Sequence, residues 1–121
     1  MATLSNAVFD SGLSTLTTNG TRIDICSAEP ATYAEATSTY TLGNSTITIG
    51  SPADRTGGGR EVTVSSVTDA SVTGTGSAAY YAITNGSNTL YATGSLSTLQ
   101  SVATGNTFSL GSFTIGIPDP A

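Results

Sequence analysis

The stretch Ser77–Thr93, SAAYYAITNGSNTLYAT, decides the fold class of this chain. It holds two runs rich in apolar residues, Ala79–Thr84 and Thr89–Thr93, with the turn sequence NGSN between them. Asparagine and glycine accept positive φ angles, and Asn-Gly between apolar runs is a strong signal for a β-hairpin. Period-two alternation in such runs means that one face is buried and the other faces water. We therefore predict an antiparallel hairpin within an all-β protein.

The same alternation assigns the tyrosines of this hairpin to faces. If Tyr81 and Ile83 point inward, Tyr80 points outward, and Tyr91 of the second run lies outward beside it. An exposed aromatic pair is typical of a contact surface. The alternative is that the rings pack in the core with their hydroxyl groups at its rim.

Turn signals recur about every ten residues along the rest of the chain and separate roughly seven to nine short strands. Thr39–Leu42 and Thr46–Ile49 are expected as two short strands. Asn106–Ile117 is expected as a long strand that bulges, or crosses from one sheet to another, at Gly111-Ser112. The pattern predicts an antiparallel β-sandwich, Ig-like or jelly-roll-like, with a short N-terminal helix or arm.

The helix is expected within residues 1–20. Phe9, Leu13 and Leu16 follow the spacing i, i+4, i+7, which places them on one helical face. Asn19-Gly20 would end the helix, because both residues accept the left-handed conformation common at helix C-termini. An irregular arm is the alternative for this segment.

The chain is expected to form one compact domain, with the arm at 1–20 and the β-sandwich at 21–121. Its clearest loop is Gly50–Arg60, GSPADRTGGGR. Three successive glycines leave this loop flexible unless a partner orders it. The loop lacks the Lys-Ser/Thr ending of a phosphate-binding loop, so we interpret it as a connector or docking loop.

Composition argues against several partners. Charged residues make up 9% of the chain, the net charge is −5, and the cations are three arginines with no lysine. Nucleic-acid binding and attachment to an anionic membrane both need many cations, so neither is expected. No apolar run approaches the roughly 20 residues of a membrane span. Because no signal sequence is visible at the N-terminus, we expect the protein to be made and folded in a cytoplasm.

Composition also argues against an enzyme. The chain has no histidine, which removes serine–histidine and cysteine–histidine catalysis and most zinc sites. Cys26 is expected to be a small packed or half-buried residue and not a nucleophile, because no histidine or lysine is present to lower its pKa. Asp54, Glu61 and Asp69 lack the spacing of a calcium loop, so solvated carboxylates are favoured over a metal site. No enzymatic activity and no cofactor are expected.

Three segments carry a resemblance to a known class of proteins: Thr18–Gly43, the stretch from Arg60 through the hairpin, and Gly105–Pro120. The distinctive part is the turn ICSAEP at Ile25–Pro30, followed by a Tyr-x-Glu-Ala segment. Together they resemble small virion proteins of tailed bacteriophages, which include head decoration, or cement, proteins. Phage collar and fibre modules share the same Thr/Gly-rich composition.

The resemblance implies a mechanical function and one main partner, the major capsid protein of the same phage. A decoration protein binds the outer surface of the mature head and stabilises contacts between capsid subunits, and it is often a homo-oligomer, with a trimer slightly favoured. The protein would be made in the host bacterial cytoplasm and end in the virion. A tail, collar or fibre component is the first alternative, and a carbohydrate-binding module on the virion surface is the second.

The contacts with the capsid or between subunits are expected from the segments Met1–Asn19 and Gly50–Arg60 and from the exposed tyrosine pair. The arginines of the loop are rare cations that could pair with capsid carboxylates. The candidate contact residues are Phe9, Leu13, Arg55, Arg60, Tyr80 and Tyr91.

Overall fold

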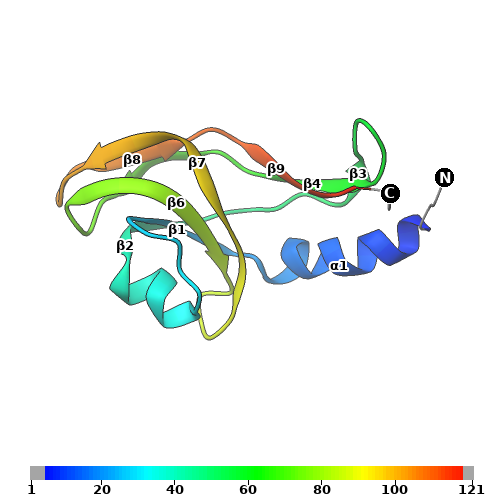
Figure 1. Ribbon diagram of the computed structural model, residues 1–121, viewed down its shortest axis with the longest axis horizontal. Helices are drawn as coiled ribbons and strands as arrows, with labels where there is room; N and C mark the ends of the chain where they lie inside the picture. The colour runs from blue at the N-terminus through cyan, green and yellow to red at the C-terminus, as the bar shows by residue number, and fades with distance from the viewer. Residues whose placement is uncertain (1–4, 119–121) are drawn as a thin grey trace.

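The computed structural model describes residues 5–118, and it is mostly β, with 49% of the residues in strands and all strand pairs antiparallel (Figure 1). The elements are α1 (Asn6–Asn19), β1 (Arg22–Cys26), a π-helical turn η1 (Glu35–Thr39), β2 (Thr41–Thr46), β3 (Ala53–Asp54), β4 (Arg60–Val64), β5 (Val67–Ser71), β6 (Gly76–Thr84), β7 (Leu90–Val102), β8 (Thr107–Leu110) and β9 (Phe113–Ile117).

The predicted hairpin is confirmed, and it is the longest strand pair within residues 5–118. β6 and β7 are joined at residues 85–89, where Gly86 has φ +75°, and they form one side of a four-stranded sheet with the order β2-β1-β6-β7. The Asn85 side-chain carbonyl accepts hydrogen bonds from the backbone N–H groups of Ser87, Asn88 and Thr89. The turn is therefore stabilised by its own side chain.

The four-stranded sheet is covered on both faces. Ile23, Ile25 and Ile83 lie in the main core, together with residues of every other sheet. Cys26 and Ala82 point to the opposite face, where Ala36 of η1 covers them. Burial on both sides explains why four of the five residues of β1 are buried, rather than every second one.

Two smaller sheets complete the fold, with the orders β3-β4-β9 and β5-β8. The chain passes from the second of these to the first at Gly111-Ser112, between β8 and β9. The crossing between sheets predicted at this dipeptide is confirmed. Val62 and Val64 of β4 point into the core, with exposed fractions of 1% and 0%.

Helix α1 is confirmed, but the conformation at its C-terminal end differs from the expectation. The side chain of Ser5 caps the first turn by accepting from the N–H of Ala7. Gly20 ends the helix with φ −79°, which is not the left-handed conformation. A Cβ atom at this position would lie 2.8 Å from the Ile49 side chain and from the Leu16 carbonyl oxygen. Glycine is needed here because the helix end packs against the core without room for a side chain.

The expectation of two short strands around Gly43 is wrong. β2 runs without interruption from Thr41 to Thr46 and pairs with β1, with a register shift opposite Ile25 and Cys26. Gly43 lets a second chain segment approach, since a Cβ there would meet Phe108 and the Ser71 carbonyl at 2.8 Å. This close approach joins β2 to the β5-β8 sheet, through a bridge between Gly43 and Val72.

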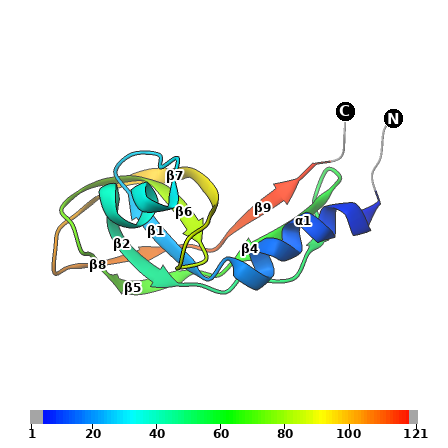
Figure 2. The same cartoon turned by 90° about the horizontal axis from the view of Figure 1, so that it is seen from below.

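In outline the molecule has a body and an arm (Figures 1 and 2). The body holds β1, β2, η1, β5, β6, β7 and β8. The arm holds α1, β3, β4 and β9, and both views show these four elements extending together away from the four-stranded sheet.

Candidate functional site

An ion-pair cluster brings together the two segments that the sequence singled out for contact. Arg60, at the start of β4, donates from Nε to Asp10 Oδ1 of α1 at 3.0 Å and from Nη2 to Asp10 Oδ2 at 3.2 Å. Its Nη1 donates to Asp54 of β3 at 2.6 Å. Residues 50 positions apart in the sequence are thus held at the arm by one guanidinium group.

The same cluster changes the expected role of Arg60. The hydrogen bonds that Arg60 donates to Asp10, and then the one that it donates to Asp54, raise the pKa of its guanidinium above the usual value. Only 16% of its side chain is exposed, whereas 88% of the Asp54 side chain is. Arg60 therefore links the helix to the loop, and the group left facing solvent is a carboxylate.

Arg55 is also held within the arm. Its Nη1 donates to the carbonyl of Gly58 at 3.0 Å, and its side chain lies across Gly116 of β9, where a Cβ would lie 2.9 Å from Arg55 Cδ. The predicted flexible loop is a tight turn between β3 and β4, with positive φ at all three successive glycines. At Gly59 a Cβ would collide with the Ile117 carbonyl, so only glycine fits.

Phe9 and Leu13 are core residues in this structure. Each has an exposed fraction of 2%, so neither offers a side chain to a partner. The helical face that the sequence identified is the face that packs inward. This corrects the expectation that these two residues make contacts with the capsid.

The expected pair of outward tyrosines does not form. Tyr80 packs on the small cluster around Cys26, and Tyr91 packs on the main core, on the opposite side of the sheet. The register shifts between Ile83 and Thr84, whose partners are Ala92 and Leu90, so Tyr91 has no partner and turns to the other face. All five tyrosines of the chain are partly buried, and none is fully exposed.

Large hydrophobic side chains that face solvent gather mainly on the arm. The exposed fraction is 57% for Val8 of α1, 37% for Ile117 at the end of β9, and 67% for Leu99 of β7. Ile117 Cδ1 lies 3.8 Å from the position of a Cβ on Gly12, which is one helical turn from Val8. Val8, Gly12 and Ile117 therefore form a small apolar strip along the arm.

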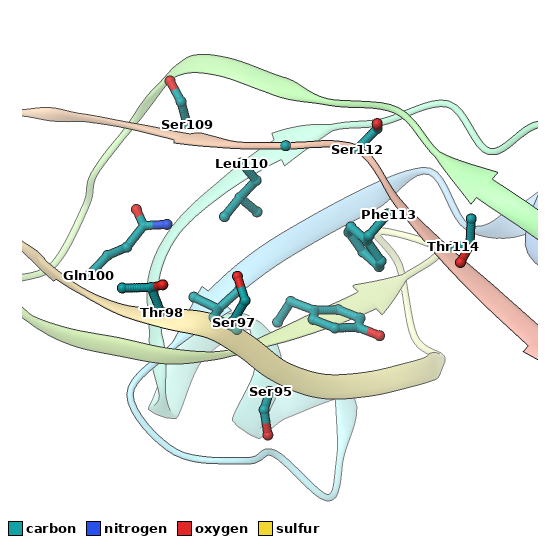
Figure 3. A pocket seen from close by; sticks show the side chains of 12 residues that line it. Ser95, Ser97, Thr98, Gln100, Ser109, Leu110, Ser112, Phe113 and Thr114 are labelled. Carbon is teal, nitrogen blue, oxygen red and sulfur yellow. The ribbon is translucent and has the colours of Figure 1, made fainter.

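A cavity of about 530 Å³ lies between β7 and the β8–β9 crossing (Figure 3). In Figure 3 Leu110 and Phe113 point from the β8–β9 segment into the space above β7, whereas Ser109 and Ser112 point away from it. Its twelve lining residues are Tyr81, Ser95, Leu96, Ser97, Thr98, Gln100, Ser109, Leu110, Gly111, Ser112, Phe113 and Thr114, and none of them is charged.

The floor of this cavity depends on a contact between an aromatic ring and a glycine. The Tyr81 ring lies over Gly94, its partner on β7, where a Cβ would be only 2.5–2.7 Å from ring atoms. The Tyr81 and Phe113 ring centroids are 4.6 Å apart with the planes tilted by 51°, a favourable aromatic arrangement. Burial raises the pKa of the Tyr81 hydroxyl.

A second cavity, of about 300 Å³, continues along the same two strands. It is lined by Tyr91 and Ala92 of β7, by Ile115 and Ile117 of β9, and by one face of α1. Since β7 and β9 contribute to both cavities, we refer to the two together as the crevice.

Two further groups, Cys26 and Asp24, are buried in the four-stranded sheet. Cys26 is fully buried, as predicted; burial, and then the charge of Asp24, raises the pKa of its thiol to about 12. Asp24 is fully buried and accepts from Arg22 at 2.8 and 3.0 Å and from Thr41 at 2.7 Å. Within residues 5–118 no group of three metal-ligating side chains gathers, and no helix has the length and apolar character needed to cross a membrane.

Comparison with known proteins finds no match: no family model, no curated protein and no solved structure is similar to this chain.

The sequence pattern did not identify the crevice. One signal was present: Leu90–Val102 contains no charged residue and no proline, the residues that usually protect the edge of a sheet. That signal becomes meaningful only when β7 is known to lie at an edge.

Proposed function

We propose that this protein is a non-enzymatic decoration protein of a tailed-phage head, which binds the outer surface of the mature capsid through its arm. The arm is the observation that carries the proposal. It unites the N-terminal helix and the Gly50–Arg60 loop, the two segments expected to make contact, in one projecting unit.

The chemistry of the arm fits a docking surface. The strip of Val8, Gly12 and Ile117 offers apolar area at one side, and the exposed carboxylate of Asp54 offers negative charge nearby in the arm. A complementary capsid face would combine a shallow apolar patch with arginine or lysine side chains. The arginines of this chain are held within the arm and are not proposed to bind capsid carboxylates.

Binding of this kind stabilises a shell by mass action. A protein that binds the expanded shell, and not the unexpanded one, lowers the free energy of the expanded state. Many copies placed on neighbouring capsid subunits add avidity, so each contact can be weak. A homo-oligomer, with a trimer slightly favoured, would increase this effect.

For the body we propose the sandwich type of fold, Ig-like or jelly-roll-like. Ile23, Ile25 and Ile83 of the four-stranded sheet share one core with Val67 of β5 and Phe108 of β8. Two antiparallel layers over a common core are the arrangement of a sandwich.

The experiment is co-sedimentation of the purified protein with expanded capsids that lack it, with unexpanded procapsids as the control. Saturable binding to expanded capsids alone, at a fixed ratio to the capsid protein, is expected. Binding to neither shell would contradict the proposal and favour a tail, collar or fibre component, which fractionation of virions would then locate. The carbohydrate-binding alternative depended mainly on an exposed pair of tyrosines. It is not favoured, because this pair does not form.

A matched pair of variants tests the arm. Val8→Asp combined with Ile117→Asp places charge on the apolar strip and is expected to weaken capsid binding at least about tenfold. Ser14→Asp is the control, because Ser14 is exposed and two residues turn a helix by about 200°, which puts it nearly opposite Gly12. Equal capsid binding by the double variant and the control would place the docking surface elsewhere.

A further inference from the structure

The chain contains two Asn-Gly dipeptides, Asn19-Gly20 and Asn85-Gly86. In such a dipeptide the backbone nitrogen of glycine can attack the side-chain carbonyl carbon of asparagine, because glycine has no Cβ atom to hinder the approach. The attack closes a succinimide ring and releases ammonia, and water then opens the ring to aspartate or isoaspartate. In a folded protein the reaction depends on whether the glycine nitrogen is free to move and on what the asparagine side chain binds.

Asn19-Gly20 lies in surroundings that oppose this reaction. The N–H of Gly20 donates to the Leu16 carbonyl at 2.8 Å. Gly20 is buried, and a Cβ built on it would lie 2.8 Å from the Ile49 side chain. Ring closure would break the helical hydrogen bond and displace the helix end from the core. Asn19 is therefore expected to stay unmodified in the folded protein, although it is exposed.

Asn85-Gly86 lies in the tight turn between β6 and β7, where the glycine has room to move. Gly86 is exposed and has φ +75°. Its chain neighbours aside, the nearest atom to a Cβ built on it is Arg22 Cβ, at 4.0 Å. Its N–H donates to the hydroxyl oxygen of Thr84 at 3.2 Å, a longer hydrogen bond than the one that holds Gly20. The Gly86 nitrogen can therefore change position without displacing core residues.

The side-chain carbonyl of Asn85 is surrounded by backbone donors of the same turn. Its Oδ1 accepts from the N–H groups of Ser87 and Asn88, both at 2.9 Å, and of Thr89 at 3.1 Å. This oxygen becomes negatively charged when the carbonyl carbon is attacked, and backbone donors placed around such an oxygen form an oxyanion hole. The turn therefore polarises the carbonyl group and stabilises the tetrahedral intermediate that precedes the succinimide.

We propose that Asn85 is a site of self-catalysed deamidation in the folded protein. The Gly86 nitrogen forms a bond to Asn85 Cγ, the bond from Cγ to Nδ2 breaks, and ammonia leaves with the proton that Gly86 loses. Water then opens the succinimide. One product is aspartate, whose carboxylate accepts the same N–H groups in stronger, charge-assisted hydrogen bonds. The other is isoaspartate, whose extra backbone methylene lengthens the turn. The inference goes beyond the proposed function, because the reaction needs only water and no partner.

The test follows both dipeptides in the same purified chain. The protein is incubated in mildly alkaline buffer, digested at intervals and analysed by peptide mass spectrometry, which detects the replacement of the amide NH₂ by OH. We expect Asn85 to react at least about tenfold faster than Asn19. In concentrated urea, where both dipeptides are unfolded, the two rates should become similar. Asn85 should react at least as fast in the folded protein as in urea, because only the folded turn places the donors around its carbonyl oxygen.

A matched pair of variants tests the backbone donors. Ser87→Pro removes one N–H group and is expected to slow the reaction of Asn85 at least about tenfold, whereas Ser87→Ala keeps the N–H group and should leave the rate unchanged. Asn85→Asp carries the aspartate product from the start and should keep the thermal stability of the natural protein. If Ser87→Pro disturbs the hairpin, the comparison between folded and urea-unfolded protein still tests the role of the donors.

Four results would contradict the proposal. Equal rates at Asn85 and Asn19 in the folded protein would show that the structure selects neither site. A slower reaction of Asn85 in the folded protein than in urea would mean that its hydrogen bonds protect the side chain. Equal rates in Ser87→Pro and Ser87→Ala would exclude the backbone donors from the reaction. A clear loss of thermal stability in Asn85→Asp would show that the turn does not accommodate the product.

Discussion

The body and the arm of this molecule share one hydrophobic core, but their charged groups lie in different surroundings, buried in the body and near the surface in the arm. In the body, β1 lies between two layers, and even the carboxylate of Asp24 is fully buried, where it accepts hydrogen bonds from Arg22 and Thr41. In the arm, Leu13 of α1 and Val62 of β4 pack in the same core, and ion pairs that reach the surface also join α1 to the β3–β4 turn, where Asp54 is 88% exposed. Buried groups determine a single structure, whereas exposed groups can exchange their partners for those of another molecule.

Two aspartates that each pair with an arginine provide the strongest test of this comparison. Asp24→Ala removes a buried carboxylate and leaves Arg22 and Thr41 without their partner, so a loss of about 3 kcal/mol in unfolding free energy is expected. Asp54→Ala in the arm removes only an exposed partner and should leave the midpoint of urea unfolding unchanged. A similar loss in both variants, measured by urea unfolding, would show that the arm is as strongly integrated as the body.

The contact between Tyr81 and Gly94 at the crevice is expected to contribute less to the free energy of unfolding than Asp24 does. Gly94→Ala places a methyl group where the Tyr81 ring lies, so the ring must move, at an expected cost of about 1–3 kcal/mol. Gly111→Ala is the matched control: it also lines the crevice, but nothing lies within 4 Å of its Cβ position. Thermal unfolding would distinguish the two, and equal melting temperatures would mean that the ring does not need the glycine.

Arg60→Ala should affect the arm alone. The variant loses the hydrogen bonds to Asp10 and Asp54 that join α1 to the β3–β4 turn, so amide exchange is expected to become faster in α1 and unchanged in β1 and β6. The difference should shrink at high salt, because the charges it removes are partly exposed. Faster exchange throughout the body would contradict the separation of the two regions. An Asp10→Arg/Arg60→Asp exchange is the control that should restore part of the protection.

Cys26 should make the free energy of unfolding depend on pH, but only at alkaline pH. Its pKa is raised to about 12 in the folded protein, above the ordinary value of about 9, so the folded state holds a proton that the unfolded state loses first. The stabilisation is complete below about pH 9 and is lost progressively as the pH rises toward 12. Urea unfolding across this range should show a steeper decline for the natural protein than for Cys26→Ala. Parallel declines would mean that the tyrosines alone account for the pH dependence.

The sequence by itself determined the elements whose signals are local. The hairpin around NGSN, the helix with Phe9 and Leu13 on one face, and the crossing at Gly111-Ser112 were all predicted and are present. Each of the three depends on the φ preferences of a few residues or on periodicity within one segment. These signals can be recognised without knowledge of distant parts of the chain.

Only the tertiary structure decided the surfaces available for binding. The face of Tyr91 depends on a register shift, and the partners of Arg60 lie 6 and 50 residues away. The crevice is lined by β7 of one sheet and by β8 and β9 of the other two, together with a face of α1. These properties arise from contacts between residues far apart in the sequence, and the alternation of side chains within one strand carries no information about which strand lies next to it.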